Sequence, residues 1–73
     1  MKAEAHDYLR SRLAGRMQEL RLAQEKRQQV EAAQSLTAER RDIEVKYYEA
    51  IIRWLLEGVE RLEAALRCAD GSL

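Results

Sequence analysis

The sequence predicts an all-α protein that folds as an antiparallel helical hairpin, and three observations lead to this fold class. The 73 residues include no proline and only three glycines, and Ala, Leu, Glu, Arg and Gln, all good helix formers, are abundant. Apolar residues recur at heptad spacing in both halves of the chain. The polar stretch 24–42 separates these halves and contains residues that favour a turn and a new helix start.

A first helix is expected over about residues 3–33. Its apolar residues follow one heptad phase: Leu9, Leu13, Leu20, Ala23 and Val30, with Met17 beside them. Arg16 and Arg27 also fall on seam positions of this phase. The predicted packing side of the first helix is therefore lean in apolar residues.

A turn is expected at about residues 34–37, where Ser35 and Thr37 can each cap a helix and Glu39 suits the first helical turn. Folding back at this turn brings apolar residues into register: Leu9 with Leu62, Leu13 with Val59, Met17 with Leu55, and Leu20 with Ile51. It also places Arg27 close to Glu44, which predicts an ion pair. This coherent register favours a single hairpin over residues 1–73.

One alternative is a continuous helix paired in a long two-stranded coiled coil, because the heptad phase runs through the chain without a slip. The seam of such a coil contains four polar layers in succession: Gln34, Thr37, Arg41 and Glu44. A run of polar layers destabilises a two-stranded coil. The hairpin is therefore the preferred prediction.

The predicted second helix, about residues 38–69, carries most of the large apolar residues. Its seam holds Tyr48, Ile51, Leu55, Gly58, Leu62 and Ala65. Further apolar residues lie beside the seam: Tyr47, Ile52, Trp54, Leu56, Val59 and Leu66. This arc covers more than half of the helix circumference, whereas one helical partner needs only a narrow seam. The second helix is therefore expected to pack against the first helix and against another surface.

The size of the chain indicates that it associates with another chain. Domains below about 80 residues rarely build a sufficient core alone, and usually depend on disulfides, a metal ion or oligomerisation. Cys68 is the only cysteine, so no disulfide can form within the chain, and one Cys with one His cannot supply a structural zinc site. We expect a homodimer, assembled as a four-helix bundle.

The residues expected to form the interface with a partner or a second subunit all lie in the second helix: Tyr47, Tyr48, Ile51, Ile52, Trp54, Leu55, Leu56 and Val59. Aromatic side chains concentrate at the centres of interfaces because they bury a large area at low entropic cost. Trp54 lies off the heptad seam, and Leu56 continues the apolar surface beyond it. Trp54 is therefore the strongest single candidate.

The sequence predicts no enzyme, and so no catalytic residue, metal site or cofactor. His6 stands beside Asp7 near the terminus, without the spacing of a metal-binding motif. The glutamates of the second helix precede arginines by four residues, as in Glu57 and Arg61, which predicts a salt-bridged solvent face rather than paired catalytic carboxylates.

The formal net charge is zero, which argues against non-specific attraction to nucleic acid or to an anionic membrane. No apolar run has the length of a signal peptide or a membrane span, and a lone thiol fits a reducing compartment, so a cytoplasmic location is expected. Basic residues do crowd onto the first helix, among them Arg12 and Arg16. A Rop-like RNA-binding bundle therefore remains an alternative.

Two short segments of the second helix resemble known families of small helical hairpins. Tyr48, Trp54 with Leu55, and Ala65 with Leu66 resemble the phage anti-quorum-sensing (Aqs-type) proteins, which are dimeric hairpins that disable host regulators. Residues 48–51 also resemble the second helix of YscE-type chaperones of type III secretion. The first resemblance implies a non-enzymatic module that binds and inhibits a partner protein. The second implies a small secretion chaperone or adaptor.

Overall fold

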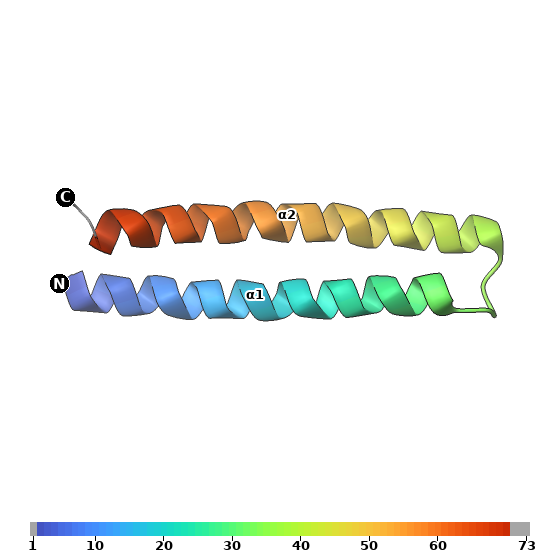
Figure 1. Cartoon of the computed structure of the whole chain (residues 1–73), viewed down its shortest axis with the longest axis horizontal. Coiled ribbons are helices and arrows are strands. Elements are labelled where there is room, and N and C mark those ends of the chain that lie inside the picture. The colour runs from blue at the N-terminus through green and yellow to red at the C-terminus, as the bar shows by residue number, and fades with distance from the viewer. Residues whose placement is uncertain (1, 71–73) are drawn as a thin grey trace.

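The protein is a hairpin of two antiparallel helices. The computed structural model describes residues 2–70, in which α1 spans Lys2–Ala32 and α2 spans Ala38–Asp70. The two helices lie side by side along their whole length, with the start of α1 and the end of α2 at the same end of the molecule (Figure 1). This architecture confirms the predicted all-α helical hairpin.

The length of the molecule is inconsistent with the long coiled coil that the unbroken heptad phase also allowed. The Cα atoms extend over 53 × 15 × 12 Å, whereas one continuous helix of this chain would be about 110 Å long at 1.5 Å per residue. The first helix begins and ends one residue earlier than expected, and the second begins at the expected residue and ends one residue later. The formation of a homodimer stays a prediction.

Thr37 starts α2 by capping its N-terminus. The Thr37 Oγ1 accepts a hydrogen bond from the backbone N–H of Arg40 at 3.1 Å, and the Thr37 carbonyl accepts the first helical bond from the N–H of Arg41 at 2.9 Å. Glu39 lies in the first turn, where its negative charge favours the helix N-terminus. Of the two expected caps, Ser35 and Thr37, the structure therefore uses Thr37.

Arg41 ties the turn to the end of α1. Its Nη2 donates hydrogen bonds to the carbonyl oxygens of Ala33, at 2.6 Å, and Leu36, at 3.2 Å. The side chain is partly buried, and a cation at this place also interacts favourably with the negative end of the α1 dipole. A residue that would be an unfavourable polar layer in a continuous coil thus holds the two helices together at their connection.

The core of the hairpin is thin. Among the described side chains, the buried apolar residues are Ala23, Leu55 and Val59, and the rest of the seam is half-buried. The radius of gyration is 16.5 Å, against about 11 Å for a compact domain of this length. The accessible surface is 5835 Å², against roughly 4,650 Å² for a compact monomer of this mass. Two helices alone leave both sides of their shared seam open.

The predicted pair between Arg27 and Glu44 is wrong. Arg27 Nη2 lies 3.0 Å from a carboxylate oxygen of Glu49, and Glu44 pairs within α2 with Arg40, also at 3.0 Å. The flexible side chain of Arg27 reaches Glu49, which lies more than one helical turn beyond Glu44 in α2. Glu44 is already paired, because the four-residue spacing of the helix brings Arg40 beside it. Glu49 is consequently used between the helices rather than along α2.

Candidate functional site

The hairpin exposes more large apolar side chains than it buries. Those exposed in the described part of the chain are Tyr8, Met17, Leu22, Ile43, Tyr47, Trp54 and Leu56. Scattered apolar residues are common on protein surfaces, whereas a contiguous apolar patch indicates an interaction site. The arrangement of these side chains on the two helices is therefore the feature that bears on function.

Two surfaces flank the seam, one on each side of the hairpin. We call the first the Trp54 face; it comprises Tyr8, Arg12 and Arg16 of α1 with Ile43, Tyr47, Trp54, Gly58 and Arg61 of α2. We call the second the Leu56 face; it comprises Arg27 of α1 with Glu49, Ile52, Arg53 and Leu56 of α2. Both faces are open to solvent in the isolated hairpin.

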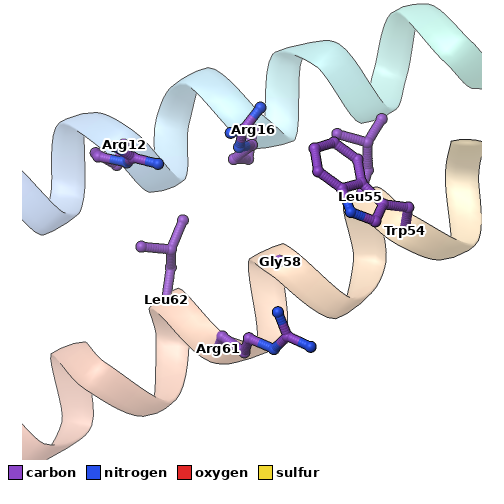
Figure 2. Close-up of a pocket in the computed structure, with 7 residues that line it drawn as sticks. All are labelled: Arg12, Arg16, Trp54, Leu55, Gly58, Arg61 and Leu62. Atoms are coloured by element: carbon purple, nitrogen blue, oxygen red, sulfur yellow. The ribbon is translucent and has the colours of Figure 1, made fainter.

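A groove of about 250 Å³ runs across the Trp54 face between the two helices, and Figure 2 shows the residues that line it. Arg12 and Arg16 project from α1, while Trp54 and Leu62 project from α2 on either side of Gly58 (Figure 2). A Cβ atom built on Gly58 would meet nothing within 4 Å. The missing side chain therefore keeps the middle of the groove open.

Cationic and aromatic side chains are stacked around this groove. The guanidinium carbon of Arg16 lies 5.3 Å from the centre of the Trp54 ring, within range of a cation–π interaction. Arg16 Nη1 also donates to both carboxylate oxygens of Glu19, at 3.1 and 3.2 Å. The guanidinium carbon of Arg12 lies 5.8 Å from the centre of the Tyr8 ring, and Arg12 Nη1 donates a hydrogen bond to the Tyr8 hydroxyl at 3.2 Å. These contacts hold both α1 arginines beside the groove.

The cations of the groove outnumber its anions. Within the residues that the structure describes, Arg12 and Arg61 have no carboxylate within ion-pair distance, and Glu19 is the acidic partner of Arg16. The predicted ion pair between Glu57 and Arg61 is therefore wrong. Guanidinium groups hold carboxylates strongly through paired, charge-assisted hydrogen bonds. The Trp54 face is thus both apolar and basic.

The Leu56 face has a different electrostatic character. Arg27 Nη2 forms an ion pair with Glu49 at 3.0 Å, and its Nε lies 3.2 Å from a carboxylate oxygen of Glu31, near enough for an ion pair but not aligned as a hydrogen bond. Ile52 and Leu56 lie beside these paired charges in a shallow groove of about 330 Å³. Arg53 has no ion pair among the described residues, and with Glu31 the face carries two cations and two anions. This face therefore presents aliphatic side chains next to charges that balance in number.

The eight residues expected to form one interface fall into three groups. Leu55 and Val59 are buried in the seam, so the hairpin uses them for its own core. Tyr48, Ile51 and Ile52 are half-buried, whereas Tyr47, Trp54 and Leu56 are exposed. The predicted interface is therefore not one continuous surface on the isolated hairpin.

Trp54 and Leu56 belong to opposite faces. Residues two apart on an α-helix point about 200° away from each other, and the two side chains accordingly line different grooves. The seam thus divides the expected interface, with Tyr47 and Trp54 on one side, Ile52 and Leu56 on the other, and α1 covering the middle.

Sequence reasoning missed the arginines that flank Trp54. In the sequence, Arg12 and Arg16 stand out only as two of several basic residues that crowd onto the first helix. Their seam and seam-edge positions, opposite Trp54 when the chain folds back, were the available signal. The exposed Tyr8 and Ile43 were missed as well, because each stands apart from the main apolar cluster in the sequence.

The described residues contain neither a metal site nor a membrane-spanning helix. In the part of the chain that the structure describes, no group of three or more His, Cys, Asp or Glu residues is placed to hold a metal ion. Neither α1 nor α2, within the same residues, combines the length and the apolar character that crossing a membrane requires. His6 is half-buried and Cys68 is exposed.

Comparison with protein-family models, with curated proteins and with solved structures finds no match to this chain. The resemblances of the second helix to Aqs-type inhibitors and YscE-type chaperones therefore stay predictions. Inference about function depends on the two faces of the hairpin.

Proposed function

We propose that this protein is a non-enzymatic interaction module, which pairs with a second copy and binds a partner protein in order to regulate or inhibit it. The observation that supports this function is the exposed apolar surface on both sides of α2, whose seam is already filled by α1. A surface of this kind is seldom left in contact with water in a soluble monomer.

Self-association follows from the thin core and the shape of the hairpin. The two helices side by side extend over 53 by 15 Å between Cα atoms, which gives the hairpin a long, broad face on which a second hairpin can pack. The Leu56 face suits a second copy, because Arg27 and Arg53 are balanced in number by Glu31 and Glu49, so two such faces can meet without strong net repulsion. Two hairpins joined in this way form a four-helix bundle.

The Trp54 face then remains available for a partner protein. Trp54 is exposed on this face together with Tyr8 and Tyr47, and such side chains supply the aromatic area that dominates binding energy in many interfaces. By covering an apolar segment of its partner, the dimer blocks the contacts which that segment makes elsewhere. An anti-activator and a secretion chaperone both act in this way, and they differ in whether the covered partner is inactivated or stored.

Sedimentation equilibrium at micromolar concentration tests the self-association directly. The wild-type chain is expected to sediment at twice its mass of 8.5 kDa. Leu56→Asp is expected to be monomeric and still helical, because it places a charge on the proposed contact without touching the buried seam. Arg67→Ala, on the exposed outer side of α2, is the control and stays dimeric. A well-folded wild-type monomer contradicts this part of the proposal.

A further inference from the structure

The Trp54 face carries an apolar ridge as well as its basic groove. Ile43, Tyr47 and Trp54 are 60, 61 and 60% exposed. Their spacing of four and seven residues keeps all three on one side of α2, and the ridge is about 16 Å long, or three helical turns. A straight ridge of this period matches the side of another helix better than it matches a loop.

The basic groove begins where this ridge ends. Trp54 belongs to both features, and Arg12 and Arg61 lie beyond it toward the open end of the hairpin. These two guanidinium groups have no carboxylate partner among the described residues, so a bound molecule can supply one without breaking an existing ion pair. The face thus combines a ridge for apolar side chains with two unused cations at one end.

We propose that the Trp54 face binds an acidic amphipathic helix of another protein. The apolar side of that helix lies along Ile43, Tyr47 and Trp54, and its carboxylates bind Arg12 and Arg61. This inference rests on the proposed function as an interaction module, and it adds the chemistry of the partner.

A second copy of the chain fits this face poorly. If two Trp54 faces meet, each brings the same arginines, and the carboxylate of Glu19 is already bound to Arg16. Like charges brought together at an interface disfavour that arrangement. The unpaired cations therefore favour a different chain, of opposite charge.

Nucleic acid also fits less well than an acidic helix. Proteins that bind nucleic acid usually carry an excess of basic residues along the contact, and here the net charge is zero, with Glu19 at the edge of the groove. The cations are confined to one end of the face, whereas the apolar ridge continues past them toward the turn. A phosphate backbone offers no apolar group that could pack against Ile43.

The test compares two synthetic helical peptides of the same length and apolar pattern, both lacking tryptophan. One carries Glu beside its apolar side and the other carries Lys at the same places. Because Trp54 is the only tryptophan, its fluorescence reports occupation of this face. The Glu peptide is expected to bind at least about tenfold more tightly than the Lys peptide, a difference of about 1.4 kcal/mol.

Charge reversal assigns the effect to the two arginines. The double substitution Arg12→Glu with Arg61→Glu is expected to reverse the preference between the peptides. Arg10→Glu with Arg67→Glu changes the net charge equally but lies outside the groove, so the Glu peptide remains preferred. Circular dichroism on both variants checks that helix content is retained.

Several results would overturn the inference. The acidic-helix proposal fails if the two peptides bind equally, if neither binds, or if the Arg12 and Arg61 substitutions leave the preference unchanged. It also fails if a single-stranded oligonucleotide binds, the peptides do not, and the binding needs the same arginines. It fails too if the Trp54 fluorescence changes only with protein concentration, which would show that self-association alone covers this face. In each of these cases, a dimeric mass in sedimentation equilibrium shows that the self-association part of the proposed function still holds. A folded monomer that binds neither peptide contradicts both proposals.

Discussion

Trp54 and Leu55 are neighbours in the chain, and they belong to two different regions of the molecule. Leu55 is 3% exposed in the seam between the helices, whereas Trp54 is 60% exposed on the open Trp54 face. The buried residues at the centre of the seam are small or aliphatic and carry no charge, and the Trp54 face is aromatic and basic. One helix therefore supports folding and binding through separate sets of residues. Substitutions in the two regions should therefore have separable effects.

The largest effect is expected in the seam. Leu55→Ala should lower the free energy of unfolding by about 2–5 kcal/mol, because it removes buried methyl groups and leaves a cavity. In a hairpin with so few buried side chains, this loss is a large part of the total stability. Thermal unfolding followed by circular dichroism measures it, and Glu57→Ala on the exposed side serves as the control. An unchanged unfolding midpoint for Leu55→Ala would show that the seam does not hold the fold.

On the Trp54 face the expected effect is on binding. Trp54→Ala should weaken binding of the acidic helical peptide by about 2 kcal/mol, or roughly thirtyfold, because a central interface tryptophan is lost. Isothermal titration calorimetry is the suitable measurement, since the variant has no tryptophan to report binding. Leu56→Ala, on the opposite face, should leave this affinity within about twofold of wild type. Equal losses from the two variants would contradict the division into two faces.

A smaller effect is expected at the turn, where Arg41 joins the two helices. Arg41→Ala removes two hydrogen bonds to carbonyl groups at the end of α1, and should cost about 1–2 kcal/mol of folding stability. Arg40→Ala is the matched control, because it removes only an exposed ion pair with Glu44, a contribution of at most about 1 kcal/mol. Urea unfolding of the two variants compares them. A greater loss for Arg40→Ala would contradict the role given to Arg41.

The smallest expected effect separates the two candidate caps. Thr37→Ala should destabilise the protein by about 1 kcal/mol, because the N–H of Arg40 loses its side-chain acceptor. Ser35→Ala should change the free energy of unfolding by no more than a few tenths of a kcal/mol. Thr37→Ser should keep most of the stability, because serine also caps helices well. The midpoints of urea unfolding provide the comparison. If Ser35→Ala is the more damaging change, then Ser35 starts the second helix.

Much of the fold could be predicted because its determinants are local. Helix propensity, heptad spacing and the residues around Thr37 indicated two helices and a turn without knowledge of distant contacts. The Arg27 partner could not be predicted in this way, because a long flexible side chain can reach carboxylates on more than one turn.

The candidate site was harder to predict than the fold. The large apolar residues of the second helix were recognised, but a helical wheel shows them as one continuous arc. Only the position of α1 shows that the arc is divided, with Leu55 covered and Trp54 and Leu56 left on opposite sides. The cluster around Trp54 depends on residues about forty positions away in the chain, so no local pattern indicates it.

The thermal unfolding midpoint of Trp54→Ala tests the separation of folding from binding most directly. A change of 1 kcal/mol shifts the midpoint of a domain of this size by about 4–8 °C. Trp54→Ala is expected to stay within about 4 °C of wild type, because the side chain is largely exposed on the hairpin. A fall as large as that of Leu55→Ala would mean that Trp54 belongs to the core, and would contradict the assignment of the Trp54 face to binding.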